Sequence, residues 1–210
     1  MPGYRNAAAR LASMRVLMLV LIPLAGCGTV SDPLPRRTFL IQLDPAAGGA
    51  HPEHKPAPPV YVAPVVVAAP FSGRRLVVRQ SDLIFEQDPY AEFAAGPVSM
   101  WTDAIRSWLD ARRLFERVLP FSTSADAPLT LETNVLQTVI DRRPGQTANS
   151  RVTIRFLLVR NAAPYQVLLD QTFTRAEPVK GPGAESEVAA LSHAADDVLS
   201  DFESALLRMP

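Results

Sequence analysis

The chain has 210 residues, of which 48% are hydrophobic and 20% are charged. This composition is typical of a globular protein and excludes fibrous and disordered classes. Its 21 basic and 21 acidic residues give a formal charge of zero, which argues against charge-driven binding to nucleic acid or to an anionic membrane. The balance is uneven, because residues 1–26 contain three arginines and no acid, leaving a formal charge of −3 on the remainder.

The first 26 residues have the layout of a secretory signal. Three arginines precede an apolar run at residues 16–24, which is too short to span a bilayer, since a spanning helix needs about 20 residues. The run leads into Leu24-Ala25-Gly26-Cys27, which resembles a bacterial lipobox. We therefore expect a lipoprotein signal peptide over residues 1–26, cleavage after Gly26, and lipidation of Cys27 to N-acyl diacylglyceryl cysteine.

Cys27 is the single cysteine of the chain. A buried free thiol is the alternative interpretation, but the position directly after the apolar run favours an anchor. Lipidation would consume the thiol, so no disulfide, thiolate metal site or cysteine nucleophile is expected. Two or three acyl chains, such as palmitate, would give stable membrane attachment. Gly28 rather than aspartate follows, which in lipoproteins of this type indicates the periplasmic face of the outer membrane.

A proline-rich region connects this anchor to the rest of the chain, with nine of the 20 prolines between residues 28 and 70. Residues 27–37 are expected to form a lipidated tether, whose part after Cys27 reaches at most about 30–35 Å when extended. A short strand is predicted at residues 38–43, followed by a flexible to semi-rigid linker at 44–59. The domain over residues 38–207 would therefore work close to its membrane.

Alternating apolar residues then predict strands. Residues 60–69 form a nearly continuous apolar run in which Pro64 argues for an edge position or a bulge. Two short strands at 76–79 and 83–86 suit a hairpin. Three further strands, separated by polar turns, predict an antiparallel meander over residues 129–140, 151–160 and 166–175.

Two segments have helical spacing instead, residues 97–115 and 184–207. The fold class predicted is α+β, a single domain in which these two long amphipathic helices pack a mostly antiparallel or mixed sheet. Core packing is the main interpretation of Trp101 and Trp108 in the first helix, and a partner surface is the alternative. Four acidic residues of the second helix lie off its apolar stripe: Asp196, Asp197, Asp201 and Glu203.

The sequence contains no nucleophile elbow, phosphate loop or complete dinucleotide loop. His51 and His54 lie in the linker, where no fold would fix the geometry of a metal site, and His193 is expected to be solvated or packed. Asp196 and Asp197 diverge by about 100° as neighbours on a helix and are interpreted as its solvent-facing side. No catalytic, cofactor or metal site is expected, and the protein is not expected to be an enzyme.

Arginine outnumbers lysine by 19 to 2, which would suit phosphate recognition. Nucleic acid is a poor candidate because the mature chain is acidic and exported. The pairs Arg74-Arg75, Arg112-Arg113 and Arg142-Arg143 could instead contact lipid headgroups or an acidic partner.

The lipobox and the order of elements resemble the ABC-type transport auxiliary lipoprotein family, which includes the paraquat-inducible PqiC-type lipoproteins. The resemblance covers roughly residues 38–207 and is best over the hairpin at 76–85. It continues through residues 90–97, which look like the family's aromatic-Ala-x-x-Pro entry into its first helix, with Phe93 where tryptophan is common.

The resemblance implies a non-enzymatic component of an intermembrane lipid transport system in a Gram-negative envelope. Its partners would be a channel protein with mammalian-cell-entry domains and the ABC permease and ATPase, and edge strands could add partners or further copies of the chain. A different envelope adaptor remains an alternative, either a peptidoglycan-synthase regulator or a lipopolysaccharide-assembly lipoprotein. An exported hydrolase is disfavoured, because no nucleophile, base and orienting group can be assembled.

Overall fold

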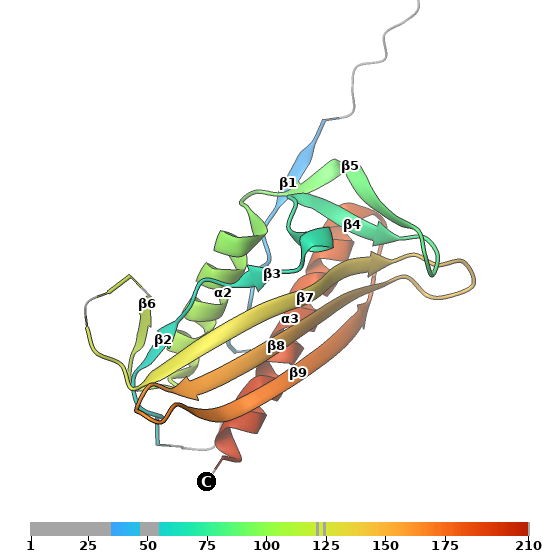
Figure 1. Cartoon of the computed structure of the whole chain (residues 1–210). Helices are drawn as coiled ribbons and strands as arrows, with labels where there is room; N and C mark the ends of the chain where they lie inside the picture. Colours follow the sequence, from blue (N-terminus) through green and yellow to red (C-terminus); the bar gives the residue numbers. More distant parts are fainter. Residues whose placement is uncertain (1–34, 47–54, 121, 124, 210) are drawn as a thin grey trace, which may run out of the picture. The chain divides into compact units, whose positions relative to one another are not determined.

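A computed structural model describes residues 35–46, 55–120, 122–123 and 125–209. These residues form a nine-stranded sheet, two α-helices and one 3₁₀ turn (Figure 1). In chain order the elements are β1 (Arg37–Phe39), β2 (Val60–Val62), β3 (Val66–Val67), η1 (Ala69–Phe71), β4 (Arg75–Arg79), β5 (Phe85–Phe93), α2 (Pro97–Arg112), β6 (Val118–Pro120), β7 (Leu129–Asp141), β8 (Asn149–Arg160), β9 (Gln166–Pro178) and α3 (Gly183–Leu207). The predicted α+β class is confirmed.

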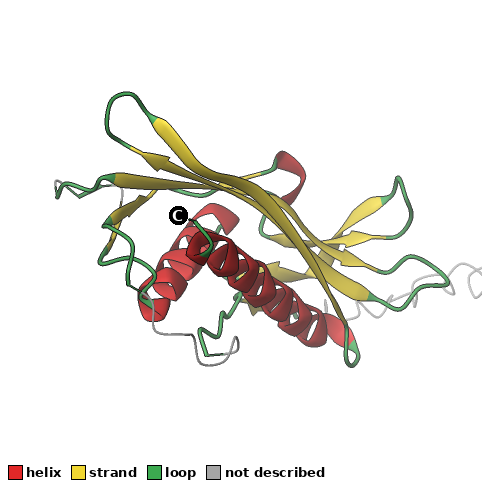
Figure 2. Ribbon diagram, turned by 90° about the horizontal axis from the view of Figure 1, so that it is seen from below, coloured by secondary structure: helices red, strands yellow, loops and turns green. Residues whose placement is uncertain are grey.

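The three long strands β7, β8 and β9 form the predicted antiparallel meander. Inward side chains of β8 alternate along the strand, so that Val152, Ile154, Phe156 and Leu158 are all fully buried. Helices α2 and α3 lie on the same side of the sheet (Figure 2). The core therefore fills the space between the helices and one sheet face.

The strands that precede the meander add to it with mixed polarity. The hairpin of β4 and β5 is antiparallel, as predicted, but β4 pairs parallel with β7. Strand β2 lies between β6 and β7 and is parallel to both, so the expected edge position is wrong for the β2 part of the run at 60–69, whereas β3 is paired with β7 alone. Pro64 instead occupies the break between β2 and β3, where no ladder hydrogen bond requires its missing N–H.

Helix α2 begins at Pro97, which suits a first helical position, and ends with Arg113 in the left-handed conformation at φ 53°. It is thus shorter than the predicted 97–115. Trp101 and Trp108 are 1% and 2% exposed and belong to the core. Both rings therefore pack in the core, as in the main interpretation. They are not exposed on a surface that a partner could contact.

Two acidic residues of α3, Asp196 and Glu203, lie inside the protein, so the interpretation of Asp196 as solvent-facing is wrong. Asp196 is 5% exposed and accepts a hydrogen bond of 2.9 Å from the backbone N–H of Asp44. Glu203 is 1% exposed and pairs with Arg112 of α2 at 2.8 Å. The segment after β1 lies against α3, and its backbone N–H groups at Gln42 and Asp44 donate to Ser192 and Asp196 of that helix, because backbone N–H groups removed from water need acceptors.

Candidate interaction surface

Three consecutive exposed apolar residues lie in the loop between β4 and β5 and at the first position of β5. Leu83 is 91% exposed, Ile84 52% and Phe85 45%. We call residues 80–85 the hairpin tip. Single exposed hydrophobic residues are common on protein surfaces, but an adjacent group of large ones is characteristic of interaction sites.

Local hydrogen bonds hold the hairpin tip in one conformation. The Ser81 hydroxyl accepts the backbone N–H groups of Leu83 at 3.3 Å and Ile84 at 3.1 Å, as serine often does in turns. The backbone N–H of Gln80 donates to the carbonyl of Ile84 at 2.9 Å. The apolar side chains are therefore displayed on an ordered loop, which lowers the entropy lost when a partner binds.

An arginine from a different part of the chain ties the hairpin tip to the turn between β7 and β8. Arg143 donates to Asp82 at 2.7 Å and to Asp141 at 2.8 Å. Arg79 donates to the carbonyl of Ser81 and to the Asp82 carboxylate, both at 3.0 Å. The two turns lie at the same end of the sheet (Figure 1), and this network joins them into one surface.

The charges of this network are stable at neutral pH. Asp141 has a side chain only 1% exposed, and hydrogen bonds from Arg143 hold its pKa below the usual range despite the opposing effect of burial. Asp141 and Asp82 in turn raise the pKa of Arg143. Arg79 also lies 5.6 Å from the ring centre of Phe85, within the range of a cation–π contact. Arg79 and Arg143 thus bind groups of the same chain. The exposed part of the hairpin tip is mainly apolar.

The other residues singled out in the sequence are not brought together into a site. Cys27, His51 and His54 lie outside the described residues. His193 is exposed on α3, and Asp197 is exposed beside the buried Asp196. Within the described ranges no cluster of three potential metal ligands occurs.

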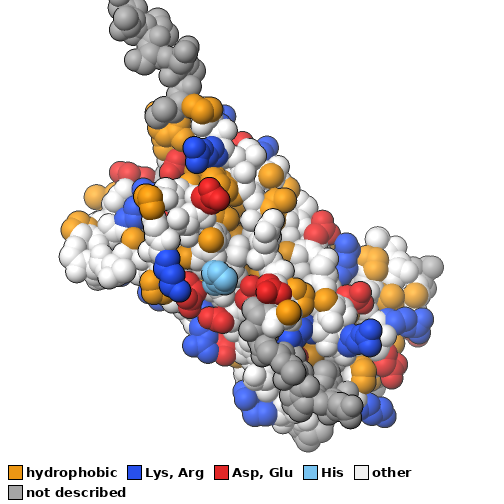
Figure 3. All heavy atoms as spheres, turned by 180° about the vertical axis from the view of Figure 1, so that it is seen from behind, with side chains coloured by type: hydrophobic (Ala, Val, Ile, Leu, Met, Phe, Trp, Pro, Cys, Tyr) orange, Lys and Arg blue, Asp and Glu red, His pale blue; other side chains and the backbone are white. Residues whose placement is uncertain are grey.

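The arginine pairs are occupied mostly by acids of the same chain. Arg142 bonds Glu187 at 2.7 Å, Arg143 bonds Asp141, and Arg112 bonds Glu203. Arg74 lies 3.3 Å from Glu92. Basic and acidic side chains are also intermixed on the face seen in Figure 3. These contacts take up four of the six arginines that the sequence offered for lipid headgroups or an acidic partner.

Sequence reasoning placed residues 83–86 in a strand and missed the hairpin tip as a surface. The signal was present in Leu83-Ile84-Phe85, because a half-buried strand alternates apolar with polar residues and a continuous apolar run next to a turn does not. The network that orders the tip could not be found in this way, since Asp82 and Arg143 are 61 residues apart.

None of the helices in the described part of the chain is both long and apolar enough to cross a membrane. No curated protein sequence matches the chain. Among solved structures it is similar to protein XCC0632 from Xanthomonas campestris, of the DUF330 family, with 17% identity and a TM-score of 0.65 over 83% of this chain and 93% of that one. A structure of an uncharacterized protein is similar at 13% identity and a TM-score of 0.60, over 83% and 97% of the two chains.

These structural likenesses agree with the α+β fold, and at such low identity they show the fold alone. The model of one protein family matches residues 39–201, which include the hairpin tip, α2, the meander and most of α3. The chain therefore belongs to the family of ABC-type transport auxiliary lipoprotein components.

Proposed function

We propose that this protein is a non-enzymatic adaptor of an intermembrane lipid transport system, anchored at the periplasmic face of the outer membrane through lipidated Cys27. It docks a channel protein with mammalian-cell-entry domains, which works with the ABC permease and ATPase. Membership of an ABC transport auxiliary family supports the general role, and the ordered apolar hairpin tip is the observation that carries the docking step.

The hairpin tip has the properties of a docking site. Interfaces draw most of their binding energy from a few apolar anchors that become fully buried, surrounded by polar groups that exclude water. Leu83, Ile84 and Phe85 supply the anchors, and the charged groups of Asp82 and Arg143 lie beside them. Since burying one such side chain contributes about 1.5–3 kcal/mol, the three together can support a specific contact.

The proposed anchor places the tip within reach of other envelope components. The sequence between Cys27 and Pro35, where the described structure begins, contains seven residues, and a fully extended chain spans about 3.5 Å per residue. The domain would therefore stay within a few tens of ångströms of the membrane. A channel that ends near that membrane would then lie within reach of the hairpin tip.

Co-purification tests the proposal. The lipidated protein is extracted from membranes in mild detergents, and captured proteins are identified by mass spectrometry. We expect a mammalian-cell-entry-domain protein with the native chain and a loss of about tenfold or more with Leu83→Asp, because a charge at a buried anchor opposes docking. Tyr165→Asp is the matched control, since Tyr165 is also highly exposed, at 78%, but lies in the β8–β9 turn.

Three results would contradict the proposal. Capture of a peptidoglycan synthase or a lipopolysaccharide-assembly protein in place of the channel would favour a different adaptor. Equal capture by the native chain and Leu83→Asp would remove the hairpin tip from the interface. A Cys27→Ala chain that is still cleaved after Gly26 and held in the membrane fraction like the native chain would exclude the expected anchor.

A further inference from the structure

A cavity of about 590 Å³ opens where the C-terminal end of α3 meets the end of β8 and the start of β9. Fourteen residues line it, of which eleven are apolar. Its floor belongs to the core, since Leu158, Leu114 and Leu129 are at most 4% exposed. Val167 and Leu207, which are 59% and 37% exposed, continue the apolar lining to its mouth. An apolar ligand could thus extend from the surface to the core along apolar side chains.

The polar residues of the cavity share one sign of charge. Lys55 and Arg160 are the two charged lining residues, Gln166 is neutral, and none of the fourteen is acidic. Arg160 donates to Gln166 at 3.1 Å. In the part of the chain that the structure describes, neither Lys55 nor Arg160 forms an ion pair, whereas most of the arginines on the interaction surface do. The two cations therefore retain their capacity to bind an anion.

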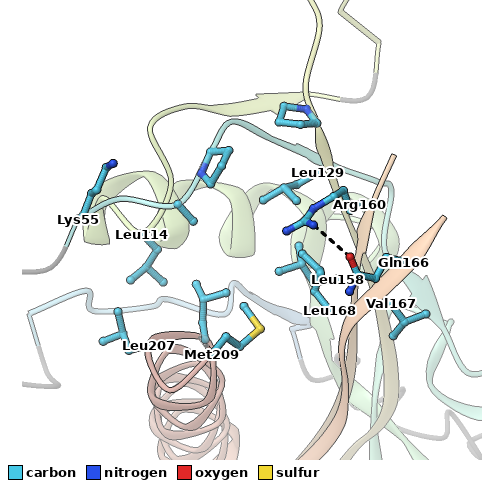
Figure 4. A pocket seen from close by; sticks show the side chains of 14 residues that line it. Lys55, Leu114, Leu129, Leu158, Arg160, Gln166, Val167, Leu168, Leu207 and Met209 are labelled. Atoms are coloured by element: carbon cyan, nitrogen blue, oxygen red, sulfur yellow. Dashed lines mark hydrogen bonds between the residues drawn. The ribbon is translucent and has the colours of Figure 1, made fainter. Parts of the chain in front are cut away.

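Figure 4 shows how these groups are arranged. Leu114 and Leu207 project into the space from separate segments, and Lys55 and Arg160 lie on different sides of it. A cation therefore lies on either side of the apolar space, and an amphiphile lying in that space could place its anionic group against one of them. Two further cavities, of about 330 and 570 Å³, both include Glu185 in their lining and lack this combination.

We propose that this cavity binds an acyl chain of an anionic lipid, with the carboxylate or phosphate group paired to Lys55 or Arg160 at the side of the cavity where it lies. Its volume lies within the range of about 300–1,000 Å³ that is usual for small-ligand sites. Each buried methylene contributes about 0.8 kcal/mol, so the apolar floor supplies affinity and the two cations select the charged headgroup. The acyl chains of a lipidated cysteine carry no anionic group, so charge complementarity favours a separate lipid molecule.

This binding site rests on the cavity alone and does not depend on the docking proposed for the hairpin tip. The probe is palmitic acid that carries a photoreactive diazirine, compared with the methyl ester of the same acid. Full-length protein in mild detergent is irradiated with either probe, and labelled peptides are mapped by mass spectrometry. We expect the acid to label the segments at residues 158–168 and 206–209, and to do so about tenfold more than the ester.

Variants separate the two parts of the site. In Lys55→Gln/Arg160→Gln, labelling by the acid should fall about tenfold, to the level of the ester, because the charge selection is gone. The matched control is Arg151→Gln/Lys180→Gln, which removes the same two charge types at the opposite ends of β8 and β9 and should label like the native protein. Leu168→Trp, which fills part of the cavity, should lower labelling by both probes.

A thermal melt of each variant verifies that it folds, and the surface charge variants are expected to melt like the native chain. Labelling that is equal for acid and ester, or unchanged in Lys55→Gln/Arg160→Gln, would overturn the proposal. Labelling concentrated on the hairpin tip at residues 80–85 would overturn it as well, because it would show that exposed apolar surface suffices.

Discussion

Arg143 donates a hydrogen bond of 2.7 Å to Asp82, and in this way the turn between β7 and β8 restrains the apolar hairpin tip. Asp82 is 78% exposed, so its removal should change stability by less than about 1 kcal/mol. Asp82→Ala should nevertheless accelerate amide exchange at residues 80–85, because Arg79 and Arg143 both lose a carboxylate there. Hydrogen exchange read by mass spectrometry measures the effect, and unchanged exchange at the tip would show that its local bonds alone order it.

Removal of the arginine should be more damaging than removal of the exposed aspartate. Arg143→Ala leaves the Asp141 carboxylate, 1% exposed, without its principal donor, so the buried carboxylate loses most of the compensation for its desolvation. Arg79 remains 3.9 Å from Asp141 and compensates part of this, so we expect a clear loss of stability that is smaller than for a fully buried pair. Urea unfolding measures it, with Arg155→Ala as control, since Arg155 pairs with Asp170 on the surface. A similar small loss in both variants would contradict the assignment.

The ion pair of Arg112 with Glu203 links the two helices from inside the protein. The side chains are 6% and 2% exposed, and Arg112 also donates to the carbonyl of Pro45. Glu203→Ala should lower the free energy of unfolding by about 3–5 kcal/mol, because it leaves a buried unpaired charge. Arg112→Met/Glu203→Leu should recover most of that loss in the same urea experiment. A double variant as unstable as the single one would show that the helices require the charges themselves.

Asp196 should make the protein less stable as the pH rises, which is opposite to the usual effect of a carboxyl group in a folded protein. Burial raises the pKa of this carboxyl to about 6, and the hydrogen bond from the Asp44 backbone only partly offsets this. The folded protein then binds more protons than the unfolded chain between about pH 4 and 6, so this contribution to stability is complete below pH 4 and is lost as the pH rises through 6. The full effect is on the order of 2–3 kcal/mol.

Asp196→Asn cannot titrate at this position, while its amide oxygen can still accept the bond from Asp44. Relative to the variant, the native protein should become more stable as the pH is lowered from 7 to 5, as measured by urea unfolding at each pH. Asp197→Asn, at the exposed neighbouring residue, should follow the native profile. Parallel profiles of the native protein and Asp196→Asn would contradict the raised pKa.

The tryptophans of α2 are expected to matter for folding and not for recognition. Trp101→Ala should destabilise the fold by about 3–5 kcal/mol, because it opens a cavity at a residue only 1% exposed. Val98→Ala on the same helix, at a residue 45% exposed, should change stability by less than about 0.5 kcal/mol. A Trp101→Ala protein with native stability and reduced partner capture would restore the partner-surface interpretation.

Local patterns in the sequence predicted the elements that carry a clear period. Alternation was sufficient for β7, β8 and β9, and three- to four-residue spacing was sufficient for α2 and α3. The strand β6, only three residues long, and the parallel pairing of β2 and β3 with β7 were not predicted. Such pairings depend on contacts between distant segments, which leave no period within either one.

The same reason explains why the sequence did not predict the burial of two acidic residues of α3. Asp196 and Glu203 lie off the apolar stripe of α3, and an isolated amphipathic helix would expose both. They are buried because the segment after β1 and the end of α2 cover that side with groups that need acceptors, Asp44 and Arg112. The family resemblance predicted the general role as a transport auxiliary component. The contacts that order the hairpin tip join distant parts of the sequence and are seen only in the structure.

The docking of the hairpin tip onto a channel protein is the central claim. The most direct measurement introduces a photoreactive amino acid at position 83 in cells that make the whole transport system, with position 165 as the control. The account predicts a crosslink from position 83 to a mammalian-cell-entry-domain protein and none from position 165. A crosslink from both positions, or from position 165 alone, would contradict it.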